Sequence, residues 1–180
     1  PLYIYSRKAL TEAYQAYDKA CVDQKGKRRA RVHYAMKANS NLAVIDCFRK
    51  LGAGFDLVSG GELARALAIG ADPKSLVFAG VGKSATEIAA ALKAGVKCIN
   101  VESIAELHKI NRVATELKLR APISLRVNPD VDAQTHPYIS TGLKGNKFGI
   151  GYHEVLKTYR EAAQLSQIDV VGIDCHIGSQ

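Results

Sequence analysis

After residue 30, short apolar segments alternate regularly with stretches of helical periodicity, and this alternation limits the folds that the chain can adopt. Short continuous apolar segments predict strands buried on both faces, which is typical of parallel sheets. The alternation predicts six strands and five intervening helices, and therefore an α/β fold with helices on both faces of the sheet. The predicted strands are residues 32–36, 54–59, 76–79, 98–101, 123–127 and 168–173, and the predicted helices are residues 42–51, 61–71, 85–94, 104–117 and 153–165.

The clearest amphipathic helix is the segment 104–117, whose apolar residues fall on one face. Ser103 is its predicted N-cap, and Glu106 is expected to complete a capping box with it. The first thirty residues fit the repeat less well. Leu2–Tyr5 is expected to form a strand and Lys8–Ala20 a helix, so we divide the chain into a lead-in, 1–30, and a repeating part, 31–180.

Two architectures fit this order of elements. A doubly wound sheet could be built from six strands, whereas a (β/α)8 barrel needs eight strands and about 250 residues. Periodicity alone does not distinguish them. The composition is that of a globular protein with a core, since 47% of the residues are hydrophobic. Because no segment approaches the roughly 18 apolar residues of a membrane span, no membrane partner is expected.

The four cysteines, at positions 21, 47, 98 and 175, form no Cys-x-x-Cys pair. Their spacing predicts neither a disulfide framework nor a zinc site, so we expect reduced thiols, a cytoplasmic location and no metal.

The net charge of +8 comes in part from a basic cluster of five residues near the start of the repeat. These residues are Lys25, Lys27, Arg28, Arg29 and Arg31. A nucleic-acid surface is one interpretation, but no aromatic residues interleave with the charges as a stacking surface requires. A solvated helix end and loop is the favoured one, and no nucleic-acid partner is expected. A positive field would still attract anionic cofactors and substrates.

Lys37 lies at the end of the first strand of the repeat, between Ala35 and Ala38, and the polar run 39–41 that follows is expected to cap a helix. In a barrel the carboxyl ends of the strands form the catalytic face. Small neighbours leave room for an adduct on the lysine nitrogen. A surface lysine at a strand end is the simpler alternative, and spacing alone favours it.

Other strand ends also carry polar residues. Arg126 lies within an apolar strand, where removing its charge from water is costly unless an anion meets it. Asp174 and His176 are two residues apart, so on a strand they share a face, although a structural His–Asp pair explains them equally well. The remaining groups are Asp56 with Ser59 to Glu62, Gly80 to Lys83, Asn128, and Gly178 with Ser179.

Four runs of sequence together resemble one enzyme family. They are Tyr34-Ala35-Met36-Lys37-Ala38-Asn39, the run 54–63 (GFDLVSGGEL), the run 136–142 (HPYISTG) with 146–149 (NKFG), and the run 176–180 (HIGSQ). The chain is similar over essentially its whole length to the diaminopimelate decarboxylases, which belong to the alanine-racemase-like group of pyridoxal-phosphate enzymes. This resemblance, and not periodicity, implies a (β/α)8 barrel of which the chain covers about the first six β/α units.

The resemblance also implies roles for individual residues. Lys37 would hold pyridoxal 5'-phosphate covalently, and the cofactor would supply the electron sink for decarboxylation. His176 would pack against the cofactor ring and Ser179 would help to bind its phosphate. The remaining implied cofactor-binding positions are Ala35 beside the ring, Asp56 as an acidic residue near the lysine and the histidine, and Arg126 as an active-site arginine that tunes the acidic residues. Glu62 would be a further acidic residue there that acts indirectly.

The segment 130–148 resembles the mobile active-site loop of this family. Gly142 and Gly145 would allow this loop to bend, and Phe148 is its last residue. An ordinary long crossover loop is the alternative, but polar loops of this length are usually functional or disordered.

The implied reaction is the conversion of meso-diaminopimelate to L-lysine and carbon dioxide by a homodimer. A related decarboxylase for arginine, ornithine or carboxynorspermidine, or a non-catalytic pyridoxal-phosphate-binding barrel, is the alternative. The family's last two barrel strands and its C-terminal β domain have no counterpart in these residues. The chain is therefore expected to be the N-terminal portion of a longer protein and to be inactive alone.

Overall fold

A computed structural model describes residues 2–129 and 148–176. The chain separates into two compact units, Pro1–Val77 and Phe78–Gln180. Each unit is built from parallel strands joined through helices, as the alternation of the sequence predicts. The division proposed at residue 30 stays a prediction.

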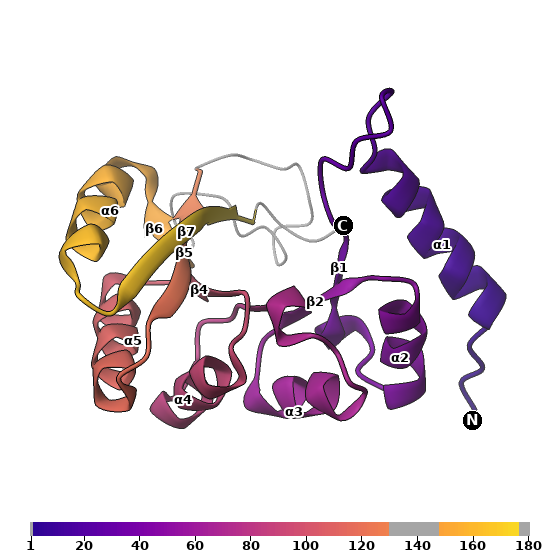
Figure 1. Cartoon of the computed structure of the whole chain (residues 1–180), viewed down its shortest axis with the longest axis horizontal. Helices are drawn as coiled ribbons and strands as arrows, with labels where there is room; N and C mark the ends of the chain where they lie inside the picture. The colour runs from indigo at the N-terminus through magenta and orange to yellow at the C-terminus, as the bar shows by residue number, and fades with distance from the viewer. Residues whose placement is uncertain (1, 130–147, 177–180) are drawn as a thin grey trace. The chain divides into compact units, whose positions relative to one another are not determined.

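The first unit starts with a long helix and continues as a strand–helix repeat (Figure 1). Strands β1 and β2 are parallel, with Tyr34 opposite Phe55 and Ala35 opposite Asp56. Helix α1 contacts α2 through Tyr14, whose ring centroid lies 6.2 Å from that of Phe48. Its elements are α1 (Arg7–Ala20), β1 (His33–Ala35), η1 (Met36–Ala38), α2 (Leu42–Lys50), β2 (Gly54–Leu57), α3 (Gly60–Ala68) and η2 (Pro73–Ser75). The boundary between the units falls within β3 (Leu76–Phe78).

The strand predicted over Leu2–Tyr5 is wrong. These residues have no regular secondary structure, and their side chains are 56–87% exposed. A strand is stabilised by the neighbour that it pairs with, and no described strand pairs with this segment. Tyrosine and isoleucine have high strand propensity, but propensity alone did not decide the conformation.

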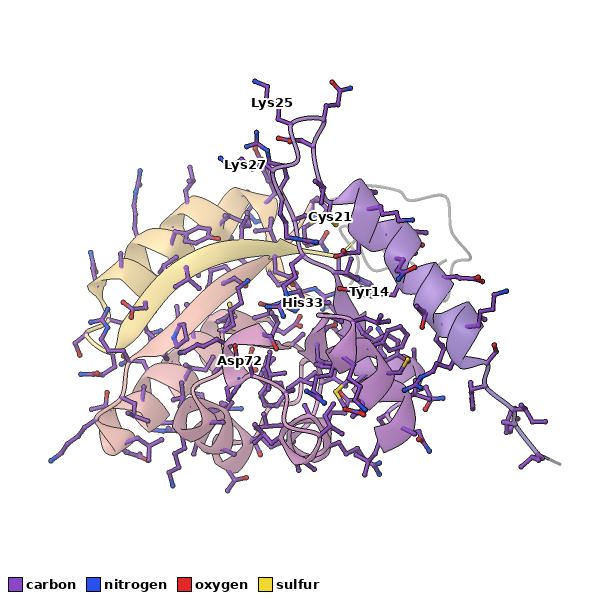
Figure 2. The ribbon with its side chains drawn as sticks, turned by 45° about the vertical axis from the view of Figure 1, so that its right-hand side comes forward. Tyr14, Cys21, Lys25, Lys27, His33 and Asp72 are labelled. Atoms are coloured by element: carbon purple, nitrogen blue, oxygen red, sulfur yellow. The ribbon has the colours of Figure 1, made fainter. Side chains whose placement is uncertain are left out.

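The basic cluster lies on the turn between α1 and β1, and Figure 2 shows Lys25 and Lys27 on the part of this turn that projects from the first unit. Arg28 binds both carboxylate oxygens of Asp18, at 2.7 and 2.9 Å, and Arg29 binds Asp23 at 2.6 Å. Arg31 donates to the carbonyl of Gly52. The solvated helix end and loop expected from the sequence is therefore confirmed, with part of its charge neutralised locally.

Gly54 is the first residue of β2, and the surrounding atoms leave no room for a side chain at this position. A Cβ there would lie 2.5 Å from the ring of His33 and 2.7 Å from the backbone oxygen of Ser75. Because a backbone oxygen cannot turn away, Gly54→Ala is expected to lower the free energy of unfolding by about 1 to 3 kcal/mol. Urea unfolding measures this, with Gly61→Ala as the matched control because its Cβ would meet only the Ser59 hydroxyl, at 3.8 Å. Equal effects of the two substitutions would contradict the prediction.

The second unit has β4 and β7 pairing with β5, all parallel, and α4 packing against α5 (Figure 1). Its core includes Ile99, Leu107, Ile110, Ile123 and Leu125, none of which is exposed. The elements are α4 (Ala85–Ala94), β4 (Cys98–Val101), α5 (Ile104–Leu117), β5 (Ala121–Asn128), β6 (Ile150–Gly151), η3 (Tyr152–Glu154), α6 (Val155–Gln164) and β7 (Ile168–Cys175).

Two features of this unit were not predicted. The short strand β6 pairs with the end of β5, with Val127 opposite Ile150. Two residues are too few for a periodic pattern, so the sequence carries no signal for it. In addition, the register between β5 and β7 shifts after Ile123, so Val171 is bypassed and Arg126 comes opposite Asp174.

Three helices begin with the same pattern, a serine followed three residues later by glutamate. Ser103 caps α5 as predicted, accepting from the backbone N–H of Glu106. The capping box predicted there is wrong, because the Glu106 carboxylate accepts from the N–H of Glu102 at 2.8 Å and not from that of Ser103. A complete capping box occurs at α4 instead, between Ser84 and Glu87. Glu106 is thus available for a different contact, described below.

Within the described ranges, none of the helices combines the length and the apolar character that crossing a membrane requires.

Candidate functional site

Lys37 lies in the single 3-10 turn η1, which directly follows the carboxyl end of β1. The turn is held from both sides. Met36 is fully buried, and the Tyr34 hydroxyl donates to the carbonyl of Asn39 at 3.2 Å while its ring stacks on Phe48. The Lys37 side chain itself is exposed. The fold therefore fixes the backbone of this lysine and presents its amine to solvent.

The segment after the lysine turn is also held in place. Asn41 caps α2, accepting from the N–H of Ala43 at 2.9 Å, and its own N–H donates to the side chain of Asn39. Arg65 on α3 donates to the carbonyl of Ser40. The helix cap predicted from the run 39–41 is confirmed, with Asn41 as its residue.

Asp56 is placed by β2 directly opposite Ala35 in the register of the two parallel strands. Residues opposite each other in a parallel pair point to the same face of the sheet, so Ala35 and Asp56 share a face beside the lysine turn. Glu62 lies in the first turn of α3, where its carboxylate accepts from the N–H of Val58 at 2.7 Å. The predicted residues Ala35, Lys37, Asp56 and Glu62 thus all lie at or just beyond the carboxyl ends of β1 and β2.

Arg126, on β5 in the second unit, is paired with a carboxylate, as its position within an apolar strand predicts. Its Nη1 donates to both carboxylate oxygens of Glu102, at 2.9 Å each. The two side chains are only 13% and 4% exposed, so the pair is largely removed from water. Phe148 lies beside it, with the Arg126 guanidinium carbon 5.7 Å from the ring centroid. Arg126 is therefore held by a carboxylate and an aromatic ring.

Gly149 makes the contact between Phe148 and Arg126 possible. Its φ is +80°, and a Cβ there would lie 3.0 Å from the backbone oxygen of Arg126. A residue with a side chain would be strained by both the conformation and the close approach.

Asp174, opposite Arg126 on β7, has an unusual environment for a carboxylate. Burial raises the pKa of Asp174 above its ordinary value; the charge of Arg126 opposes this increase and that of Glu102 adds to it. The charge of His176 lowers the pKa of Asp174 and so opposes the effect of burial. The His–Asp pair predicted from the spacing therefore does interact electrostatically.

The raised pKa of Asp174 predicts a pH dependence of stability. The folded protein holds the proton of Asp174 more tightly than the unfolded chain does. The stability that this protonated carboxyl contributes is therefore complete below its pKa in the unfolded chain, about 3.9, and is lost as the pH rises through its higher pKa in the folded protein. Asp174→Asn is therefore expected to gain free energy of unfolding relative to the parent as the pH rises from about 4 towards neutrality. Urea unfolding at a series of pH values measures this difference.

Asp169, on the same strand, is the control of opposite sign. A hydrogen bond from Arg120 lowers the pKa of Asp169, so its contribution is present above the unfolded value and is lost as the pH falls through the lowered one. Asp169→Asn should thus lose stability at neutral pH. If Asp174→Asn behaves in the same way as Asp169→Asn, the assignment to Asp174 is wrong.

Several predicted residues lie outside the described ranges, namely Ser179, Gly142, Gly145 and most of the segment 130–148. Sequence reasoning assigned no role to Glu102, and it predicted for Glu106 only a place in a capping box. Glu102 follows an apolar strand just as Lys37 does, so its position was a usable signal. Among residues 2–129 and 148–176, no group of three or more His, Cys, Asp or Glu side chains is placed to hold a metal ion.

Comparison with known proteins identifies the family to which this chain belongs. The family model of the pyridoxal-dependent decarboxylases, for their pyridoxal binding domain, matches residues 7–180. The chain therefore belongs to the family of pyridoxal-dependent decarboxylases.

Its relatives within that family carry one particular name. Diaminopimelate decarboxylase of Neisseria meningitidis serogroup A is 58% identical over 180 residues, which are 100% of this chain and 43% of the relative. The crystal structure of diaminopimelate decarboxylase from Helicobacter pylori, complexed with L-lysine, has a TM-score of 0.94 and 45% identity over 100% of this chain and 45% of that one. The enzyme from M. jannaschii, also with L-lysine, has a TM-score of 0.91 and 41% identity over 100% and 42%.

These similarities confirm the parallel α/β fold of the barrel-type decarboxylases that the resemblance implied. They also confirm pyridoxal phosphate as the cofactor of the family. The chain spans less than half of the length of these relatives.

The described residues fit this cofactor. Its aldehyde condenses with a primary amine, and Lys37 presents an exposed one from a rigid turn at a strand end. Ala35, the residue before the turn, has a side chain too small to obstruct a ring beside it.

Proposed function

We propose that the protein carrying this chain decarboxylates meso-diaminopimelate to L-lysine and carbon dioxide with pyridoxal phosphate bound to Lys37. The observation that carries the proposal is the exposed amine of Lys37, held on a fixed turn at the carboxyl end of β1 in a chain of the pyridoxal-dependent decarboxylase family. The diaminopimelate decarboxylases among its relatives, two of them crystallised with L-lysine, support the choice of substrate.

In this proposal the bound cofactor supplies an electron sink for the carbanion left when carbon dioxide departs. The chain's own residues bind and orient it. Lys37 provides the nitrogen to which it is attached, which must give up its proton to react, and Ala35 and Asp56 flank the lysine turn. Arg126, His176 and Ser179 retain the cofactor-binding roles implied by the resemblance. Glu62 has a supporting role within the first unit, because its carboxylate fixes the start of α3 through the N–H of Val58.

The experiment that tests the function is a substrate panel. The protein, produced at its full encoded length, is incubated with pyridoxal phosphate and with meso-diaminopimelate, arginine, ornithine or carboxynorspermidine, and released carbon dioxide is measured. We expect turnover of meso-diaminopimelate, with L-lysine as the product. Preferred turnover of another amino acid would replace the substrate, and binding of the cofactor without any turnover would favour a non-catalytic role.

We also propose that the protein is cytoplasmic and homodimeric. All four cysteines are free, which suits a reducing compartment. The dimer rests on the family resemblance alone, and sedimentation of the full-length protein tests it, because a monomer at micromolar concentration would contradict it.

A further inference from the structure

Lys83 is a buried lysine without a role in the function proposed above. Its side chain is 0% exposed. Its Nζ donates to the carbonyls of Gly80 and Asn100, at 2.5 and 2.8 Å, and to both carboxylate oxygens of Glu106, at 3.1 Å each. An ammonium group has three donors, and these partners use all of them. Lys83 therefore has a single well-defined position.

Burial at this site is costly. Removing an ammonium from water carries a large free-energy penalty even in relaxed proteins, and pairing with a carboxylate often does no more than offset it. Burial accordingly lowers the pKa of Lys83, against the opposing charge of Glu106. A buried ion pair is thus weak evidence for added stability. Its better-attested role in proteins is to hold the surrounding groups in one geometry.

The contacts lead from Lys83 to Arg126 by two routes. Glu106, held by Lys83, accepts from the backbone N–H of Glu102 at 2.8 Å. Gly80, whose carbonyl binds Lys83, donates its own N–H to the Glu102 carboxylate at 3.2 Å. Both the backbone and the side chain of Glu102 are therefore tied to partners of Lys83, and the Glu102 carboxylate holds Arg126.

We infer that Lys83 is a positioning residue: by fixing Glu106 and Gly80 it orients Glu102, and through Glu102 it holds Arg126 in the geometry that its cofactor-binding role requires. The chemical class of ligand served is an anionic pyridoxal cofactor. This inference rests on the proposed function, because Arg126 takes its role from that function.

A double-mutant cycle separates positioning from a general loss of structure. The dissociation constant for pyridoxal phosphate is measured by absorbance titration of the full-length protein as parent, Lys83→Met, Arg126→Met and the double variant, alongside kcat and KM. Methionine has a similar length without the charge. Lys93→Met, an exposed lysine on α4, is the matched control and should bind as the parent does.

If Lys83 acts through Arg126, Lys83→Met weakens binding by on the order of tenfold and adds nothing in the Arg126→Met background. If the fold-losses of cofactor affinity in the two single variants multiply in the double variant, the inference is overturned and the proposed function stays intact. The same holds if Lys83→Met binds the cofactor as the parent does. A parent protein that does not bind the cofactor would overturn both. Should Lys83→Met not fold, Glu106→Gln, which keeps the shape and one acceptor oxygen, takes its place in the same cycle.

Discussion

Replacing Lys37 by alanine is expected to abolish the covalent attachment of pyridoxal phosphate and to lower kcat by about a thousandfold or more. The physical reason is that the amine is the only group of this side chain that can bond to the cofactor aldehyde, and alanine removes it entirely. Loss of the visible absorbance of the bound cofactor and loss of carbon dioxide release measure the two effects. Retention of both would show that Lys37 is not the cofactor lysine.

The structure predicts that this loss occurs without unfolding. The Lys37 side chain is exposed, and the turn beneath it is held by Met36, Tyr34 and Asn41. Substitutions at exposed positions away from caps and buried networks usually change stability by no more than about 0.5 kcal/mol. Lys74→Ala, at an exposed lysine of the same unit, is the matched control and should keep both colour and activity. A large fall in the melting temperature of Lys37→Ala would contradict this expectation.

Glu106→Leu is expected to be the most destabilising single change in the second unit, lowering the free energy of unfolding by about 3 to 5 kcal/mol. It leaves the ammonium of Lys83 buried without its carboxylate, and it removes the acceptor for the N–H of Glu102. Guanidinium unfolding of the full-length protein, with Glu116→Leu on the exposed face of the same helix as control, measures the difference.

A second variant distinguishes an unpaired charge from a poor fit of leucine. In Lys83→Met with Glu106→Leu no buried charge is left over, so the double variant should be more stable than Glu106→Leu alone. A double variant that loses the sum of the two single effects would show that the charge pairing contributes little. The same result would weaken the case for Lys83 as the support of Glu102.

The positions of the helices and strands were largely predictable because each has its own local signal. The segment 85–94 is bounded as predicted, since Ser84 caps its start and Gly95, with a φ of +76°, ends it. Strand Cys98–Val101 is likewise as predicted, because a fully buried parallel strand is a continuous apolar run. The Leu2–Tyr5 segment has an equally good local signal but no partner strand, and the presence of a partner cannot be read from the segment itself.

The candidate site was predictable only in part, for the same reason. Lys37, Asp56 and Arg126 could be recognised individually because each is a polar residue at a strand end or within an apolar strand. The partner of Arg126 required knowing which strand end lies beside it. Glu102 is 24 positions away in the sequence, and no periodic pattern links residues at that separation.

The repeated Ser-x-x-Glu pattern correctly predicts where helices begin, but it does not predict which N–H the glutamate carboxylate accepts from. The patterns at Ser59, Ser84 and Ser103 each start a helix, and each serine accepts from the glutamate N–H. Only Glu87 returns its carboxylate to the cap residue, whereas Glu62 and Glu106 reach one residue further back. For Glu106 the difference has a tertiary cause, because its carboxylate also binds Lys83.

Chemical mapping shows directly which lysine holds the cofactor. The full-length protein is incubated with pyridoxal phosphate, reduced with borohydride to make the attachment permanent, digested and examined by mass spectrometry. We expect the peptide containing Lys37 to carry the reduced cofactor, and Lys83, whose donors are all engaged, to remain unlabelled. Stoichiometric labelling of another lysine, or no labelling at all, would contradict it.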